Sequence, residues 1–280
     1  MIPVPDDLPR QVSAAIEEDL GEGDITAALI PASATTTARI ITRDQAVFCG
    51  APWAEAVFLS VDPAIRIHWR VRDGDAVEPE QVLCELEGPA RGLLTAERTA
   101  LNFLQTLSAT ATETRAHVAI VAGTRATILD TRKTIPGLRT AQKYAVRCGG
   151  GENHRSGLFD GILIKENHIA ACGGIKAAVN AARGSHPGIA VEVEVESLEE
   201  LREALAAQAD IVMLDNFDLP MLRQAVDLAA GNARLEASGG LDREGLRAVA
   251  ETGVDYISIG ALTKHVRAVD LSMRVTEPST

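Results

Sequence analysis

Six short apolar segments, each followed by an amphipathic stretch, limit what the second half of this chain can fold into. Apolar strands that alternate with helices pair in parallel and are joined by right-handed crossovers. The predicted strands span residues 126–129, 161–164, 189–195, 210–214, 233–237 and 256–259. Six units are fewer than the eight of a complete (β/α) barrel. The sequence therefore predicts an α/β fold that is either an incomplete barrel or an open doubly wound sheet.

The first hundred residues follow a different pattern. Short runs between residues 37 and 88 alternate polar and apolar side chains around an Asp73-Gly74 turn, which is typical of antiparallel strands. Helices are predicted over residues 8–20, ending at Gly21, and from Thr95 to about residue 122. The tail alternates again. We predict an N-terminal α+β sheet domain over residues 1–108, which the tail 267–280 rejoins, and an α/β catalytic domain over residues 109–266.

The composition argues against several classes of protein. A formal net charge of -12 argues against nucleic-acid binding. No apolar run reaches the roughly 18 residues that a membrane helix needs, and the N-terminus lacks a signal-peptide pattern. The four cysteines stand far apart without C-x-x-C spacing, which argues against a zinc site or a disulfide framework. We expect a cytoplasmic protein with no membrane or nucleic-acid partner.

Residues 131–165 carry seven basic side chains and only two acidic ones, in a chain that is acidic overall. Crowded like charges repel each other, so such a cluster usually has an anionic partner. A solvated helix face is the alternative. Several of these residues, however, follow predicted strands, where binding groups concentrate. We expect a pocket for a small polycarboxylate, because forked guanidinium groups bind carboxylates well. Its binding side chains would be Arg132, His154, Arg155 and Lys165.

In a barrel, the residues that follow each strand converge on one mouth. The predicted strands are followed by Thr131, Arg132 and Lys133, by Lys165, by Asp215, by Ser238-Gly239-Gly240 and by Gly260. The strand VEVEVE places Glu192, Glu194 and Glu196 on one face. That face is either the wet side of an edge strand or a carboxylate row that meets a cation. We expect Glu194 and Asp215 to hold a Mg²⁺ ion that binds phosphate oxygens.

Glycines at two strand ends indicate a phosphate site. Ser238-Gly239-Gly240 precedes a helix that starts near Asp242, and backbone N–H groups at a helix start bind phosphate. Gly260 would complete this site, as paired late loops do in barrels; an ordinary tight turn is the alternative. Gly149-Gly150-Gly151 is not followed by Lys-Ser/Thr and is therefore no P-loop. No G-x-G-x-x-G follows a strand, so no dinucleotide cofactor is expected.

Several stretches of the chain resemble one enzyme family. Residues 130–169, DTRKTIPGLRTAQKYAVRCGGGENHRSGLFDGILIKENHI, closely resemble quinolinate phosphoribosyltransferase, also called carboxylating nicotinate-nucleotide pyrophosphorylase. ERTALNFLQ, VEVEVE, IVMLDNF, EASGG and ISIGALT resemble other blocks of the same family. The resemblance implies an incomplete α/β barrel with an N-terminal open-faced antiparallel sheet. It also implies a homodimer with a shared active site.

The resemblance further implies a reaction. Quinolinate and phosphoribosyl pyrophosphate would give nicotinate mononucleotide, pyrophosphate and carbon dioxide, with Mg²⁺, in NAD synthesis. Arg132, His154, Arg155 and Lys165 would bind the quinolinate carboxylates, and Arg98 would reach them from the partner subunit. The implied catalytic residues are Lys133, between quinolinate and pyrophosphate, and Glu194 and Asp215, at the ribose and the metal. The implied substrate site also includes Thr131, Ser238, Gly239, Gly240 and Gly260.

Three other interpretations stand beside this one. A paralogue from molybdenum transport operons shares the fold, but its central block is less similar to HRSGLFDGILIKENH. A binding or regulatory protein could keep the fold without activity, although the complete cation and carboxylate sets argue against it. An unrelated phosphate-binding barrel isomerase would leave the arginine cluster without a role.

Overall fold

The computed structural model describes residues 2–240 and 242–276, which fall into two compact units. Unit 1 takes the described residues within Met1–Arg115, Thr134–Gly150 and Leu262–Thr280, and unit 2 takes those within Ala116–Lys133 and Gly151–Ala261. These bounds differ from the predicted division at residue 108, because helix α4 (Arg139–Gly149) packs into the core of unit 1 through Tyr144, Ala145 and Cys148.

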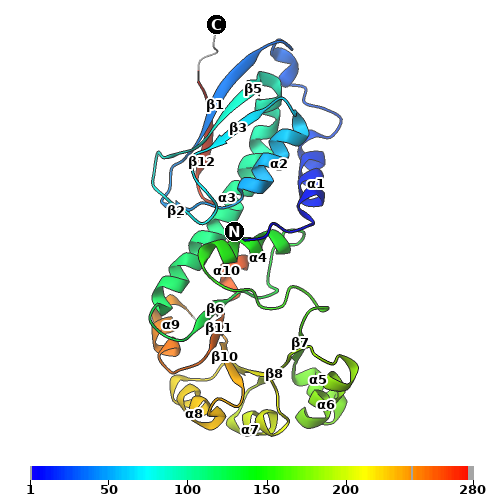
Figure 1. Ribbon diagram of the computed structural model, residues 1–280, viewed down its shortest axis with the longest axis vertical. Coiled ribbons are helices and arrows are strands. Elements are labelled where there is room, and N and C mark those ends of the chain that lie inside the picture. The colour runs from blue at the N-terminus through cyan, green and yellow to red at the C-terminus, as the bar shows by residue number, and fades with distance from the viewer. Residues whose placement is uncertain (1, 241, 277–280) are drawn as a thin grey trace. The chain divides into compact units, whose positions relative to one another are not determined.

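An antiparallel four-stranded sheet forms the frame of unit 1 (Figure 1). Its order is β12-β1-β5-β3, with β1 (Thr35–Thr42), β3 (Arg66–Trp69), β5 (Val82–Pro89) and β12 (Leu271–Thr276). The tail of the chain thus returns to pair with β1, where Thr37 lies opposite Thr276. On the solvated face, Nε of Arg39 lies 3.6 Å from Oε1 of Glu85 in β5. β2 (Ala46–Val47) and β4 (Ala76–Val77) form a separate ladder.

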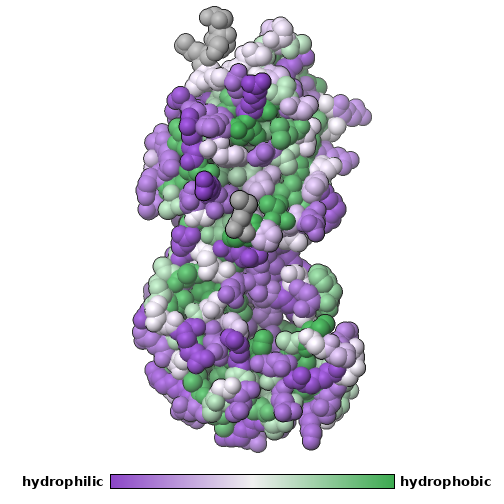
Figure 2. Space-filling model, in the orientation of Figure 1, coloured by the Kyte–Doolittle hydropathy of each residue, from purple (hydrophilic) through white to green (hydrophobic). Residues whose placement is uncertain are grey.

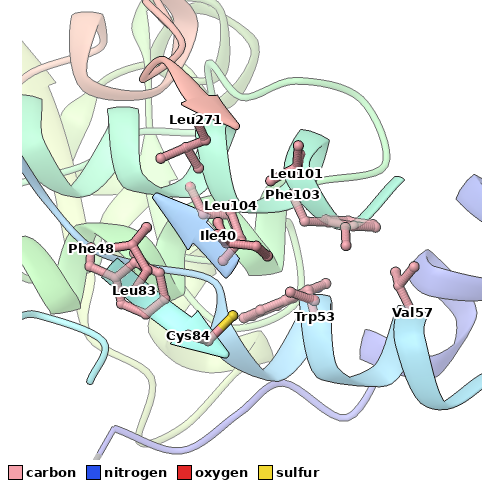
Figure 3. Close-up of a cluster of buried hydrophobic side chains, with 14 of the residues drawn as sticks. Ile40, Phe48, Trp53, Val57, Leu83, Cys84, Leu101, Phe103, Leu104 and Leu271 are labelled. Atoms are coloured by element: carbon pink, nitrogen blue, oxygen red, sulfur yellow. The ribbon is translucent and has the colours of Figure 1, made fainter. Parts of the chain in front are cut away.

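Helices cover the other face of this sheet and close the core of unit 1. Ile40 and Leu83 of the sheet pack with Trp53 of α2 and Leu104 of α3 (Figure 3), and each large apolar side chain buried in this way stabilises the fold by roughly 1.5–3 kcal/mol. The helices are α1 (Leu8–Leu20), the short 3₁₀ helix η1 (Ala27–Leu29), α2 (Ala51–Val61), α3 (Ala90–Val121), α4 and α10 (Ala261–Lys264). The predicted end of the first helix at Gly21 is confirmed. Helix α3 begins five residues before the predicted Thr95, because β5 leads directly into it.

Six parallel strands form the sheet of unit 2, in the order β6-β11-β10-β9-β8-β7. They are β6 (Thr127–Leu129), β7 (Ile162–Ile164), β8 (Val191–Val195), β9 (Ile211–Asp215), β10 (Arg234–Ser238) and β11 (Tyr256–Ser258), and they confirm the six predicted strands. Each strand from β7 to β11 lies beside the next in sequence, and β6 lies beside β11. A doubly wound sheet would reverse its order part-way. The order is therefore that of a barrel, and it is incomplete because no ladder among the described residues joins β6 to β7.

The loop that follows α4 covers the free edge of β6. Glu152 donates its N–H to the carbonyl of Ile128 at 2.9 Å, and the N–H of Asp130 donates to the carbonyl of Glu152 at 3.2 Å. Glu152 thus forms an isolated parallel bridge with Leu129. The chain runs beside β6 for one residue before it turns toward His154.

Helices of unit 2 alternate with its strands and surround the sheet (Figure 1). They are α5 (Glu166–Cys172), α6 (Ile175–Ser185), α7 (Leu198–Ala206), α8 (Leu219–Ala229) and α9 (Arg243–Ala250). Ser197, Asp218 and Asp242 each cap a helix by accepting a backbone N–H from its first turn. Side chains alternate across a strand, so the buried valines of β8 lie on one face of the sheet and its glutamates on the other.

Hydrophobic residues are interspersed with hydrophilic ones on the face drawn in Figure 2. Within the described part of the chain, no helix combines the length and the hydrophobicity that crossing a membrane requires.

Candidate active site

The carboxyl ends of the six strands in unit 2 bring the predicted mouth residues to one edge of the sheet. Lys165 directly follows β7, and Glu194 lies near the end of β8. The Nζ atom of Lys165 contacts Oε2 of Glu194. Asp215 ends β9 and lies directly opposite Ser238, which ends β10. The same edge carries Thr131 after β6 and Gly239, Gly240 and Gly260 after β10 and β11.

Two positions at the mouth, 239 and 260, need glycine because a Cβ atom would collide with a neighbouring side chain. Gly239 has φ 124, and a Cβ atom there would lie 2.5 Å from Oδ1 of Asn216. Asn216 itself is left-handed, with φ 57, and donates its N–H to the carbonyl of Ser238 at 3.0 Å. A Cβ atom on Gly260 would lie 2.9 Å from Cδ of Lys133. The turns after β9 and β10 are therefore packed together, and Lys133 lies against the turn after β11.

A second group of polar side chains lies on two of the same strands, two residues before the mouth residues of each strand. Glu192 precedes Glu194 in β8, and Glu236 precedes Ser238 in β10. The Nε2 atom of His154 lies 2.8 Å from Oε2 of Glu192 and 3.6 Å from Oε2 of Glu236. We call His154, Glu192 and Glu236 the lower layer. His154, predicted for the mouth, has its closest carboxylate partners here.

The lower layer borders a pocket of about 390 Å³ in unit 2. Arg155 also lines this pocket, as do Ile211 and Tyr256, which begin β9 and β11. The pocket therefore extends toward the amino ends of the strands, below the mouth.

Asp130, which directly follows β6, fixes the loop that carries His154 and Arg155. Its side chain is fully buried. One carboxylate oxygen accepts the backbone N–H of His154 at 2.9 Å, and the other accepts the side-chain amide of Asn153 at 2.6 Å. The backbone N–H of Arg155 donates to Nδ1 of His154 at 2.8 Å. The loop is therefore held by hydrogen bonds at three successive residues.

The positive charges of Arg132 and Arg155 lie near enough to affect each other. Burial is the main cause that lowers the pKa of Arg155, and the neighbouring charge of Arg132 lowers it further, whereas Glu192 and Asp160 raise it. The buried Nε atom of Arg132 has no hydrogen-bond partner among the described residues. A buried donor without an acceptor is unfavourable unless a ligand supplies one. This pair is therefore suited to an anion.

The buried carboxyl groups of the lower layer affect each other. Burial raises the pKa of Glu236 to about 8; the charge of Glu192 acts in the same direction, and His154 opposes it. Two buried carboxyl groups this close to each other do not both ionise readily. Glu236 is therefore the member of the pair that carries a proton at neutral pH.

Arg98 lies in unit 1, on α3, and is exposed. It lines a pocket of about 270 Å³ in that unit together with Asp19, Asp24 and Thr95. Its expected role in the site of a partner subunit stays a prediction.

The residues predicted for Mg²⁺ are compatible with that ion. Glu194 and Asp215 stand at the carboxyl ends of neighbouring strands, and each accepts a side-chain donor, from Lys165 and Asn216 respectively. Mg²⁺ usually binds one or two carboxylates and completes its shell with water and substrate phosphates. The pair offers that donor set at the mouth.

A different cluster joins residues that are distant in sequence. Cys49, Asp73 and Cys148 of unit 1 place their ligand atoms within 4.8 Å of one another. Both cysteines are free and buried. Asp73 is already satisfied, because it accepts the N–H groups of Gly50 and Ala51 and the hydroxyl of Tyr144. The cluster is therefore a packed part of the core.

Three further residues of the site, Asp130, Glu192 and Glu236, were not assigned a role from the sequence. Glu192 shares a face with Glu194, and that alternation was the available signal for it. Asp130 and Glu236 begin two of the blocks that resemble the family, DTRKT and EASGG, but no role was predicted for them, since their contacts arise from the loop that enters beside β6.

Comparisons with known proteins cover nearly the whole chain. The family model described as "Quinolinate phosphoribosyl transferase, C-terminal domain" matches residues 110–274, and the N-terminal domain model of that family matches residues 24–108. The chain belongs to the quinolinate phosphoribosyltransferase family. The resemblance seen in the sequence motifs is thus confirmed, and so is the α/β fold with its antiparallel sheet domain.

Quinolinate phosphoribosyltransferase relatives match nearly the full length. The "Probable nicotinate-nucleotide pyrophosphorylase [carboxylating]" of Bacillus subtilis is 45% identical over 260 residues, covering 92% of this chain and 90% of the relative. The Mycobacterium leprae protein of the corresponding name is 46% identical over 270 residues, covering 94% and 95%. The solved structure of the nicotinate-nucleotide pyrophosphorylase from Francisella tularensis has a TM-score of 0.95 and 50% identity, with 98% of each chain covered.

The C-terminal quinolinate phosphoribosyltransferase domain contains every residue of the mouth and of the lower layer. Arg98 falls in the N-terminal domain.

Proposed function

We propose that this chain transfers the phosphoribosyl group of phosphoribosyl pyrophosphate to quinolinate, with loss of carbon dioxide. The product would be nicotinate mononucleotide, for NAD synthesis. Membership of the family and the names of its relatives support this reaction. Within the structure, one observation carries it: the buried Nε donor of Arg132 has no partner among the described residues, and the charge of this residue acts on that of Arg155. A dicarboxylate would supply acceptors and relieve the repulsion between the two cations.

The two substrates would occupy different parts of unit 2. Quinolinate would lie against Arg132 and Arg155, with Lys165 and His154 beside it. The 5′-phosphate of the sugar would lie on the backbone of Ser238, Gly239, Gly240 and Gly260, where glycine permits close approach to backbone N–H groups. Thr131 supports this arrangement, because its hydroxyl accepts the backbone N–H of Lys133 at 3.1 Å.

The chemistry follows from the charges at the mouth. When pyrophosphate leaves C1, positive charge develops on the ribose, and the carboxylates of Glu194 and Asp215 would stabilise it electrostatically. Lys133 would stabilise the negative charge of the departing pyrophosphate. The pyridine nitrogen then attacks C1 and becomes positively charged. That charge stabilises the electron pair left on C2 when the adjacent carboxylate leaves as carbon dioxide, and C2 then takes a proton from solvent. No protein nucleophile is needed.

Glu194 and Asp215 would also hold Mg²⁺, which would supply further neutralisation of the pyrophosphate oxygens. Lys165 already contacts Glu194, so this carboxylate is shared between the predicted metal and the quinolinate side of the mouth.

A homodimer is part of the proposal. Arg98 is exposed, and the pocket that it lines also includes Ile25, whose surface is 89% exposed. Leu29 nearby in sequence is 83% exposed. Large exposed apolar side chains beside a charged group are typical of protein contacts. We propose that Arg98 completes the quinolinate site of a partner subunit. The four free cysteines suit a reducing, cytoplasmic compartment.

The decisive test is incubation of the purified chain with quinolinate, phosphoribosyl pyrophosphate and Mg²⁺, with nicotinate mononucleotide and carbon dioxide measured together. We expect both products in equal amounts and none when nicotinate replaces quinolinate. Failure to form nicotinate mononucleotide with Mg²⁺ or Mn²⁺ present would refute the proposal.

A further inference from the structure

Two buried glutamates stand behind the residues that are proposed to bind quinolinate. Glu192 is 4% exposed and Glu236 is 1% exposed. Ionisable side chains are almost never buried this deeply unless they are paired. One oxygen of each carboxyl group, Oε1, is buried and has no hydrogen-bond partner among the described residues. Burying two carboxyl groups in this way is unfavourable, so the contacts that they make are important.

His154 provides one of these contacts. The backbone N–H of Arg155 donates to Nδ1 of His154 at 2.8 Å, so Nδ1 accepts and the ring proton lies on Nε2. Nε2 then donates to Oε2 of Glu192 at 2.8 Å. The imidazole is thus fixed at both nitrogens. Through Nδ1 it also fixes the backbone of Arg155, whose guanidinium donates to the carbonyl of Gly161 at 3.3 Å.

We propose that Glu192 and Glu236 are positioning residues, which orient His154 and, through its ring, the backbone of Arg155 toward quinolinate. This proposal rests on the proposed function, because quinolinate is the ligand whose binding would depend on that orientation. Glu192 makes the contact with Nε2. Glu236 lies on β10, two strands from Glu192 in the sheet order, and the carboxylate oxygens of the two residues lie within 4.8 Å of each other.

The charge of the pair is consistent with this role. With Glu236 protonated, its hydroxyl gives a donor to the neighbouring carboxylate, and the lower layer carries one negative charge instead of two. A single buried negative charge beside Arg155 is balanced by that guanidinium, whose pKa the charge of Glu192 raises. A doubly charged pair would repel the quinolinate carboxylates.

Two substitutions at Glu192 distinguish the effect of side-chain length from the effect of charge. Glu192→Asp keeps the charge but withdraws the oxygen from His154, whereas Glu192→Gln loses the charge but keeps an acceptor in place. We expect Glu192→Asp to raise the Kd of quinolinate about tenfold, the loss of roughly one hydrogen bond to a charged group. We expect Glu192→Gln to stay within about threefold of the parent, and the Kd of phosphoribosyl pyrophosphate to change less than about twofold in both. Glu196→Asp, the same change at an exposed glutamate of the same segment, is the matched control.

Glu236→Gln tests the second member. An amide mimics the neutral acid, since it both donates and accepts, so we expect quinolinate binding within about twofold of the parent at pH 7. Titration calorimetry gives both dissociation constants without turnover, so the result does not depend on product formation. The opposite ranking at Glu192, or a large loss in Glu236→Gln, would overturn the positioning role.

Nitrogen-15 NMR of the histidine rings provides a readout that a merely structural role would not move. We expect the signal of His154, assigned by its loss in His154→Gln, to show the Nε2–H tautomer in the parent and in Glu192→Gln. Glu192→Asp should show mixed tautomers. A fixed tautomer in all three proteins would contradict the proposal.

The same atoms also lie close enough to ligate a cation, within 4.8 Å of one another. Tight one-to-one binding of Zn²⁺ alone, abolished in both Glu192→Gln and Glu236→Gln, would replace the positioning role with a metal site. We expect no such binding, because Arg155 lines the same pocket and would repel the ion.

Discussion

Lys165 and Glu194 join two neighbouring parallel strands at the mouth of the barrel, the ammonium group after β7 contacting the carboxylate of β8. The lysine side chain is 42% exposed and the glutamate 12%. An anion that approaches from solvent therefore meets Lys165 first and competes with Glu194 for it. The contact holds the ammonium group of Lys165 beside Glu194 at the mouth.

Replacing Lys165 by Met should remove a cation from the quinolinate site and leave Glu194 without its partner. We expect kcat/KM for quinolinate to fall by at least about 100-fold, since one partner of a part-buried pair is lost together with a ligand contact. Steady-state kinetics measures this. Lys176→Met, at an exposed lysine of α6, should leave the kinetics unchanged; an equal loss there would show that the effect is not local.

Removing either guanidinium of the arginine pair should affect the two substrates unequally. Arg132→Ala and Arg155→Ala should each weaken quinolinate binding by about 10- to 100-fold, as expected for a charge-assisted hydrogen bond of about 1.5–3 kcal/mol. The Kd of phosphoribosyl pyrophosphate should change far less. Calorimetry with each substrate alone checks this, and equal weakening of both would contradict the division of the site.

Gly239 should not tolerate a side chain. In Gly239→Ala, the Cβ atom would meet Oδ1 of Asn216 at 2.5 Å in a left-handed backbone, so the turn must shift. We expect a higher KM for phosphoribosyl pyrophosphate and a lower Tm, with about 1–3 kcal/mol of strain. The control is Gly184→Ala in α6, where a Cβ atom would meet nothing within 4 Å. Unchanged KM values in Gly239→Ala would argue against a phosphate site at this turn.

Glu236 should make the protein less stable as pH rises. Its folded pKa is about 8 against an ordinary value of 4.5, so the folded state holds the proton more tightly than the unfolded chain does. Its favourable contribution is full below pH 4.5 and is lost as pH rises through 8. The free energy of unfolding from urea titration should therefore fall with pH more steeply in the parent than in Glu236→Gln, in which this group cannot ionise. Parallel profiles would contradict the assignment of the proton to Glu236, whose neighbours are Glu192 and His154.

Mixing two inactive variants should restore activity if the site is shared between subunits. Arg98→Ala and Lys165→Ala would each lack one half of the quinolinate site. A heterodimer retains one intact site, so we expect up to about a quarter of the parent activity after subunit exchange, the statistical limit of equal mixing. Exchange is verified by native mass spectrometry. Absence of recovery in verified heterodimers would exclude a contribution of Arg98 in trans.

The strands and most helices of this fold could be predicted from local patterns. The apolar runs end at polar or glycine residues, so all six barrel strands were placed within about two residues. The choice between a barrel and a doubly wound sheet could not be made locally, because it depends on β6 lying beside β11. Strand order is set by long-range packing.

The candidate site divides in the same way. The mouth residues were predictable because each lies at the end of a strand or just after it, as Asp215 and Lys165 do. The contact between His154 and Glu236 was not predictable, since the two residues come together only when β10 and the loop after α4 meet in space. The proximity of Cys49 to Cys148 likewise could not be predicted from their spacing in the sequence.

The loop that follows α4 has two functions, because it forms the backbone bridge between Glu152 and β6 and also carries residues of the site. It occupies hydrogen-bonding groups of an edge strand that would otherwise be available to another chain, and it carries His154 and Arg155. A substitution that breaks the backbone bridge should therefore expose the edge of β6 and favour aggregation. A screen that keeps only soluble variants would then discard substitutions in this loop before their effect on substrate binding is measured.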